Sequence, residues 1–136
     1  MTWVVDTCVV LDVLEGDPEF GLASARLIDK LAGEGLTLCP VSYIELSPAF
    51  LGDKERQSEF LAEIGIDYAQ SWDWSDTLQA HKAWDRYVSK RRQDCIAKRP
   101  VADILIGAFA SERNGLLTRN ESDFRAVFPT LTIATP

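Results

Sequence analysis

The sequence contains a single histidine and only three cysteines. Cys8, Cys39 and Cys95 are widely spaced, odd in number and form no Cys-x-x-Cys pair. This pattern argues against a disulfide framework and predicts a reducing, cytoplasmic compartment. No Cys/His spacing suits a zinc site. A Walker A or Gly-x-Gly-x-x-Gly motif is also lacking, so nucleotide-binding classes have no support.

Long apolar runs are lacking as well. None is long enough to span a bilayer, and a polar residue as early as Asp6 does not fit a secretory signal. The 136 residues are 46% hydrophobic and 26% charged, which is typical of a folded globular chain. We therefore expect one domain, residues 1–136, with a core of its own.

Basic residues are outnumbered, at 14 against 21 acidic residues, and the net charge is −7. Such a balance generally disfavours nucleic-acid binding. Segment 86–99 is the exception, with a net charge of +5 that leaves −12 on the rest of the chain. Its basic residues are Arg86, Lys90, Arg91, Arg92, Lys98 and Arg99, against the single acid Asp94. The segment fits contacts with an RNA backbone beside an acidic site, and a solvated helix face is the alternative.

Short apolar runs alternate with helical patterns along the chain. The runs TWVVDT, LTLCPVS, IDYA, GLLT and LTIAT predict strands, with Pro40 at the end of the second. Helical patterns cover 8–15, 20–31, 43–51, 54–64, 76–92 and 101–113, followed by a helical turn at 121–126. This alternation, without hairpin signals, predicts an α/β fold: a parallel sheet of four to five strands flanked by helices on both faces.

Two features invite a functional interpretation that the pattern does not favour. His81 shares a helical face with Ala80, Trp84, Tyr87 and Val88, which predicts a packed or interface histidine rather than a general base. Trp72 and Trp74 flank Asp73 in a loop, where packing is a better interpretation than base stacking.

Polar side chains gather after the predicted strands. In open parallel sheets, ligands bind outside the carboxyl ends of the strands. The candidates at this edge are Asp6, Glu45, Asp103, Thr118, Asn120 and Asp123.

Taken singly, most of these residues have a structural explanation. Asp6 fits a helix cap, and SYIE fits a capping box in which Glu45 reaches back to Ser42. Asn120 and Asp123 fit the start of a short helix. These alternatives stay open for each residue considered alone.

Asp103 is harder to explain in this way, because VADILI surrounds it with apolar residues and a buried, unpaired carboxylate is costly. Four carboxylates on one rim would repel one another unless a cation lies among them. Carboxylate oxygens are ligands of Mg²⁺ or Mn²⁺, ions that activate water and stabilise a phosphoryl transition state. Thr118 and Asn120 fit the positioning of a water or a phosphate oxygen. Jointly, these residues predict metal-assisted phosphodiester hydrolysis.

Four blocks carry a family resemblance. VVDTCVVLDVL, VSYIEL, VADILIGAFA and LLTRNESDF, in this order, resemble the signature blocks of PIN-domain ribonucleases, most of all VapC-type toxins of bacterial type II toxin–antitoxin pairs. The resemblance implies Mg²⁺-dependent endoribonuclease activity, with Mn²⁺ as a substitute, homodimerisation, and inhibition by a cognate antitoxin whose tail covers the site. It also implies that Asp6, Glu45, Asp103 and Asp123 bind the metal, supported by Thr118 and Asn120.

One departure from the family pattern concerns Cys8, which stands where the family often has Asn. A thiol is a weaker hydrogen-bond partner than an amide, and acidic surroundings raise its pKa and argue against a nucleophilic role. Two other classes of protein use strand-end acids or the same fold. A phosphotransfer or receiver-like domain requires a second Asp at position 8, or an acid pair with a strand-end Lys. A PIN-fold protein-binding module with weak or no catalysis would not need all four acids.

Overall fold

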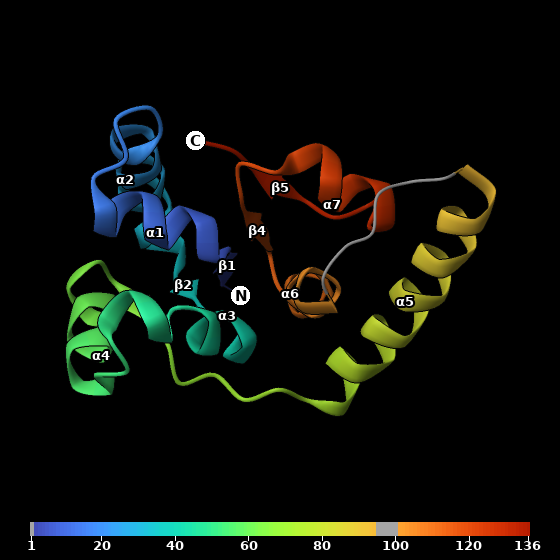
Figure 1. Cartoon of the computed structure of the whole chain (residues 1–136), viewed down its shortest axis with the longest axis horizontal. Helices are drawn as coiled ribbons and strands as arrows, with labels where there is room; N and C mark the ends of the chain where they lie inside the picture. Colours follow the sequence, from blue (N-terminus) through green and yellow to red (C-terminus); the bar gives the residue numbers. More distant parts are fainter. Residues whose placement is uncertain (1, 95–100) are drawn as a thin grey trace.

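The computed structural model describes residues 2–94 and 101–136, which fold around a five-stranded parallel sheet with the strand order β3-β2-β1-β4-β5 (Figure 1). The strands are β1 (Trp3–Val5), β2 (Leu36–Thr37), β3 (Ile66–Asp67), β4 (Gly115–Leu117) and β5 (Ile133–Ala134). The chain leaves β1 in one direction to build β2 and β3, and later returns to build β4 and β5 on its other side. The strand order therefore reverses at β1 and β4, where open α/β sheets bind ligands.

Helices connect the strands and cover both faces of the sheet (Figure 1). The α-helices are α1 (Thr7–Glu15), α2 (Gly21–Leu31), α3 (Pro40–Glu45), α4 (Lys54–Glu63), α5 (Trp74–Asp94), α6 (Val101–Ser111) and α7 (Glu121–Val127). Two short 3-10 helices, η1 (Ala32–Glu34) and η2 (Ser47–Phe50), follow α2 and α3. The parallel α/β architecture expected from the sequence is confirmed. Cys95, Lys98, Arg99 and Pro100 lie outside the described residues.

Alternate residues of the central strands pack into two separate halves of the core, one on each face of the sheet. Val4 and Leu116 belong to a cluster with residues of α5, α6 and α7, whereas Val5 and Leu117 belong to a cluster with residues of α1, α2 and α4. All four side chains are fully buried. Successive residues of a strand face opposite sides of the sheet, and both must be apolar when helices cover both faces.

The region around Pro40 differs from the expectation. Strand β2 ends at Thr37, and Pro40 begins α3 instead of ending the strand. Proline suits this position because the first residue of a helix needs no N–H partner. The single helix expected over 43–51 is divided into α3 and η2, since Pro48, at the start of η2, has no N–H with which to continue an α-helix.

The buried stripe of α5 is also displaced from the expected one. Ala80, Ala83 and Tyr87 are buried, whereas His81 is exposed and Trp84 is 43% exposed. The interpretation of His81 as a packed core residue is therefore wrong for this chain by itself. The helix contacts the core through one narrow stripe, so residues one position away from it face outward.

Trp72 lies in the loop before α5, whereas Trp74, also expected in a loop, is the first residue of the helix. The Trp72 ring stacks on Phe109 of α6, with 6.0 Å between ring centroids, and its Nε1 donates to Thr77 Oγ1 over 2.8 Å. Trp74 is 73% exposed. The packing prediction is thus confirmed for Trp72.

Close packing also sets the distance between α6 and α7. A Cβ at Gly107 of α6 would overlap the ring of Phe128, which follows α7 directly. The absence of a side chain lets α7, which carries Asp123, lie against α6, which carries Asp103. No helix in the described parts of the chain is long and apolar enough to cross a membrane.

Candidate active site

Asp6 lies at the carboxyl end of β1, directly before α1. Its carboxylate is 5% exposed and its side chain does not cap α1, so the capping explanation fails. Oδ2 instead accepts hydrogen bonds from Thr118 Oγ1 at 2.7 Å and from Cys8 Sγ at 3.4 Å. The central strands β1 and β4 thus bring together residues 112 positions apart in the sequence.

The surroundings of Asp6 oppose its negative charge. Burial raises the pKa of Asp6, and the nearby charge of Asp103 raises it further, while hydrogen bonds from Thr118 and Cys8 act in the opposite direction. An acid whose pKa is raised by burial and by a second acid is a typical candidate for a functional site. A cation would relieve both effects.

Asp103 and Asp123 face a common space. Both line one small hollow, together with Ile104, Phe124, Val127 and Phe128. Asp103 lies in the first turn of α6 and Asp123 in the first turn of α7, where helix dipoles favour negative charge. The prediction that these two acids meet at the rim is consistent with this arrangement.

Glu45 joins the site through α1. Its Oε1 accepts a hydrogen bond from Thr7 Oγ1 at 2.7 Å. The expected capping box is wrong, because Ser42 lies inside α3 and Cys39 occupies the N-cap position. Glu45 is therefore held at the start of α1 by Thr7, the residue that follows Asp6 in the chain.

Thr118 and Asn120 form the loop after β4. The Thr118 hydroxyl is fully buried, donates to Asp6 and accepts from the Asn120 backbone N–H at 3.1 Å. Asn120 occupies the N-cap position of α7 without a side-chain capping bond, and its Nδ2 lies 3.9 Å from Cys8 Sγ. Thr118 therefore orients Asp6, whereas the Asn120 side chain turns toward α1.

Cys8 occupies the centre of these contacts. Its Sγ lies 3.4 Å from Asp6 Oδ2 and 3.8 Å from Thr118 Oγ1. Burial, and then the charge of Asp6, raise the pKa of Cys8 to about 12. The thiol stays protonated at neutral pH, in line with the expectation that it is not a nucleophile.

One residue of this loop was missed from the sequence. Arg119, between Thr118 and Asn120, reaches back to Asp12 of α1 with Nε–Oδ2 at 3.0 Å and Nη2–Oδ1 at 3.2 Å. The signal was the acid in VVLDVL, since a buried Asp among apolar helix residues requires a partner.

The donor set at this edge consists of carboxylate, hydroxyl and amide oxygens, which suits Mg²⁺ or Mn²⁺ rather than zinc. Asp103 lies close enough to Asp6 to raise the pKa of Asp6, and a divalent ion between the two carboxylates would offset this repulsion. In residues 2–94 and 101–136, no group of three or more His, Cys, Asp or Glu residues is close enough to hold a metal ion. The acids are brought together in pairs and through hydroxyl contacts, not as one four-carboxylate cluster.

With this geometry the family can be assigned. The sequence model of the PIN domain matches residues 3–127, so the chain belongs to the PIN-domain family. Its fold is similar to a crystal structure of VapBC2 from Rickettsia felis bound to a DNA fragment from their promoter. That match has a TM-score of 0.68 and 15% sequence identity, and it covers 99% of this chain and 98% of the other. Among curated proteins, no sequence match is found.

Proposed function

We propose that this chain is a metal-dependent endoribonuclease, the toxin of a type II toxin–antitoxin pair, which hydrolyses RNA phosphodiester bonds. The main support is the buried Asp6, held by Thr118 and repelled by Asp103, at the strand-order reversal of a PIN domain. A PIN domain of this kind is expected to be a nuclease, and the VapBC2 neighbour favours the toxin class.

Each residue has a separate part in the proposed site. Asp6, Glu45, Asp103 and Asp123 would hold Mg²⁺, or Mn²⁺ in its place, and the ion would have to draw these acids together, because no three of them form a ready group in the described residues. The ion would supply an activated water and stabilise the charge that develops on the phosphate. Thr118 fixes the orientation of the Asp6 carboxylate through its 2.7 Å hydrogen bond, and the Asn120 backbone fixes the Thr118 hydroxyl in turn.

The decisive experiment is cleavage of single-stranded and structured RNA by the purified chain, freed of any antitoxin. Activity should require Mg²⁺ or Mn²⁺ and stop with EDTA. Asp6→Asn and Asp103→Asn should each lower the rate by about a hundredfold or more, since each removes a charge that holds the metal.

Asp53→Asn is the matched control, because Asp53 caps α4 away from the site and Asn can replace it as a cap. This variant should retain full activity. Cleavage that survives EDTA, or that is indifferent to Asp6→Asn, would refute the metal mechanism. Loss of cleavage in all preparations would favour the binding-module alternative.

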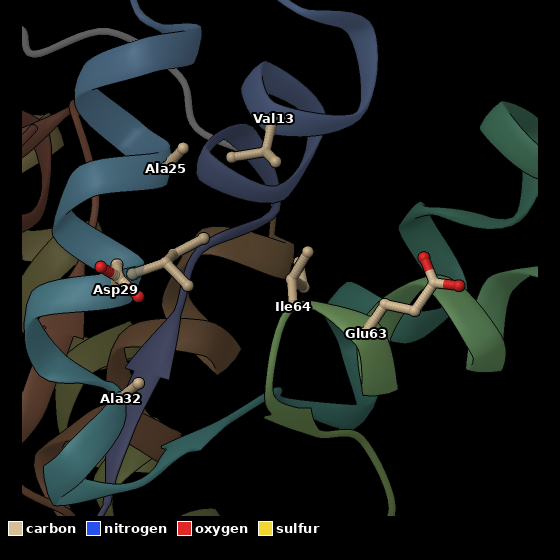
Figure 2. A pocket seen from close by; sticks show the side chains of 7 residues that line it. Val13, Ala25, Asp29, Ala32, Glu63 and Ile64 are labelled. Carbon is tan, nitrogen blue, oxygen red and sulfur yellow. The ribbon is translucent and has the colours of Figure 1, made fainter.

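We also propose a cognate antitoxin as partner, with its tail over the site. A separate cavity of about 220 Å³ between α1, α2 and α4, lined by none of the proposed site residues, offers a docking place for another part of the same partner (Figure 2). Val13, Ala25 and Ile64 give it an apolar lining, and the carboxylates of Asp29 and Glu63 lie on opposite sides of it. An amphipathic segment with basic residues would match both properties.

The antitoxin proposal is tested by the paired variant Asp29→Asn/Glu63→Gln. Binding of the neighbouring gene's product should weaken, and its dependence on salt should fall, while RNA cleavage by the free chain stays unchanged. Equal affinity at every salt concentration would exclude this cavity as the docking surface.

A homodimer is the remaining partner proposed. Large apolar side chains are exposed on α5 and at the start of α6, namely Trp74, Leu78, Trp84 and Val101. Trp84 and Val101 line one hollow with Ala80 and Leu105, and an exposed apolar surface of this kind suits an interface between copies of the chain. Light scattering should give twice the monomer mass, and Trp84→Glu should return the mass to that of one chain.

A further inference from the structure

Arg119 ties the loop of the candidate site to the first helix. Its two donors, Nε and Nη2, meet the two carboxylate oxygens of Asp12 at 3.0 and 3.2 Å. A paired contact of this kind fixes the direction of the guanidinium as well as its distance. The tether spans 107 residues of sequence, from the end of β4 to the middle of α1.

Both members of the pair have further contacts. Asp12 is 3% exposed and also accepts a hydrogen bond from Ser24 Oγ of α2 at 3.2 Å. The Arg119 guanidinium lies over the Phe20 ring, 4.7 Å from its centroid. Helix α1, the start of α2 and the loop after β4 therefore meet at one ion pair.

An ion pair with one buried partner is weak evidence for stability, because apolar residues of similar volume often serve as well. Its position suggests another role. Arg119 is the residue between Thr118, whose hydroxyl orients Asp6, and Asn120, whose backbone N–H holds that hydroxyl. A shift of the Arg119 backbone would displace both neighbours together.

We propose that the Asp12–Arg119 pair is a positioning clamp, which holds the Thr118–Asn120 loop at the distance from α1 at which Thr118 orients Asp6. Arg119 acts through Thr118 and does not itself contact the reacting atoms. The catalytic consequence rests on the proposed nuclease function, whereas the effect on loop geometry does not.

The chain contains a matched control. Arg113 Nη1 contacts Asp76 Oδ1 at 2.9 Å, and its guanidinium lies over the Phe109 ring, 3.4 Å from the centroid. This pair has the same chemistry and joins the end of α6 to the start of α5. The side-chain hydrogen bonds of Arg113 go to Asp76 and to the Phe109 carbonyl, and not to Asp6, Cys8 or Thr118.

The experiment compares Asp12→Asn/Arg119→Met with Asp76→Asn/Arg113→Met, both in a Cys95→Ser background. Removing both charges avoids a buried charge without a partner. The first substitution keeps an acceptor for Ser24, and the second keeps apolar contact with Phe20. The readout is the rate at which an aromatic disulfide reagent modifies Cys8 at pH 8, relative to Cys39.

Cys8 touches Asp6, Thr118 and Asn120, and so reports on the loop, whereas the fully buried Cys39 reports on opening of the whole fold. The clamp variant should raise the Cys8 rate about tenfold or more, with Cys39 unchanged. The control variant should leave the Cys8 rate itself as in the wild type; Cys39 is not its reference, because the charges of Asp76 and Arg113 act on the pKa of Cys39. An unchanged ratio in the clamp variant would overturn the proposal.

RNA cleavage provides the second readout. In the clamp variant kcat should fall about tenfold with KM within twofold of wild type, because the loop orients a site residue and does not bind substrate. A wild-type chain without cleavage would refute the proposed function, and the Cys8 ratio would still decide the clamp. Should the double variant not fold, Arg119→Lys is tested instead, since lysine keeps the charge but not the paired donors. The ratio of the Cys8 rate to the Cys39 rate should again rise, and an unchanged ratio would overturn the proposal.

Discussion

Strand β4 is flanked by two arginines whose side chains go to opposite faces of the sheet. Arg113 precedes the strand and pairs with Asp76 over Phe109, on the α5–α6 side. Arg119 follows the strand and pairs with Asp12 over Phe20, on the α1–α2 side. The same combination of residues thus serves two purposes, and the neighbours of each pair, not its chemistry, decide which.

The neighbours of the first pair are elements of the scaffold. Asp76 also accepts the Asp73 backbone N–H at 2.9 Å, which closes the start of α5, and Arg113 donates to the Phe109 carbonyl at 2.7 Å. The pair is buried, with side chains 13% and 1% exposed. It joins two helices and satisfies their backbone groups.

The neighbours of the second pair belong to the site. Asp12 raises the pKa of Arg119, so the guanidinium remains charged, but this charge is directed at Asp12. The pKa of Asp6 is raised, not lowered, although Arg119 follows its hydrogen-bond partner Thr118 in the chain. The pair therefore orders the loop and leaves the site acidic, as a cation site requires.

The largest effect is expected from breaking the scaffold pair. Arg113→Met should leave the Asp76 charge buried without its partner and lower the free energy of unfolding by about 3 kcal/mol. Arg119→Met also leaves a buried carboxylate, but it should cost less, because the Arg119 side chain is 35% exposed and solvent already weakens the ion pair that is lost. Urea unfolding measures both. RNA cleavage per folded molecule should be retained in Arg113→Met and lowered in Arg119→Met. Equal losses of cleavage in the two variants would show that the two ion pairs do not differ in role.

Much of this arrangement could be predicted from the sequence. Asp6, Thr118 and the two-sided parallel sheet follow from apolar runs that end in polar residues, a local pattern. The Arg119–Asp12 and Arg113–Asp76 pairs could not, because each depends on a side-chain direction set by the packed fold. The divided helix after Pro40 and the outward position of His81 were missed for a related reason: a difference of one residue in register decides which residues face the core.

A smaller effect is expected within the site loop. Asp123→Asn should lower the rate of RNA cleavage by roughly tenfold, less than Asp6→Asn, if the acid acts through a bound water, and Thr118→Ala should cost less again. Single-turnover rates at saturating RNA measure this order. If Asp123 only favoured the start of α7, Asp123→Asn would keep full activity and Asp123→Ala would lower stability instead.

Asp6→Asn should raise the stability of the metal-free chain, whereas Arg113→Met should lower it. The pKa of Asp6 is higher in the folded chain than in the unfolded chain, so its contribution to stability is present below pH about 4 and is lost as the pH rises through the folded value. The variant carries no charge and escapes this loss. Its melting temperature at pH 8 without metal should therefore exceed that of wild type.

Added Mg²⁺ should make wild type more stable than Asp6→Asn, which reverses the order of their melting temperatures without metal. The ion binds only the folded site, so wild type should gain stability with its concentration, whereas Asp6→Asn should gain little. Asp103→Asn should likewise be more stable than wild type without metal and respond weakly to the ion. An equal response of wild type and either variant would show that the acid is not a ligand.

The smallest effect is expected on RNA binding, from two arginines that belong to neither ion pair. Arg91 and Arg92 near the end of α5 are exposed, and they line a groove of about 300 Å³ with Trp84, Tyr87 and Val88. Neither the scaffold nor the site loop is built on them, which is why their expected role is contact with RNA phosphates. Arg91→Ala/Arg92→Ala should therefore weaken RNA binding only severalfold and leave stability unchanged.

The salt dependence of binding distinguishes phosphate contacts from a general change of charge. Each phosphate contact with single-stranded RNA contributes about 0.7 to the slope of log K against log salt, so the double variant should lower that slope by roughly 1.4. Binding is measured in EDTA, so that no RNA is cut. Arg26→Ala/Arg56→Ala removes the same charge from exposed positions on α2 and α4 and should leave the slope nearly unchanged. Equal slopes in both variants would assign 86–92 to a solvated helix face or a protein interface, and RNA would then reach the acids of β1 and β4 by another surface.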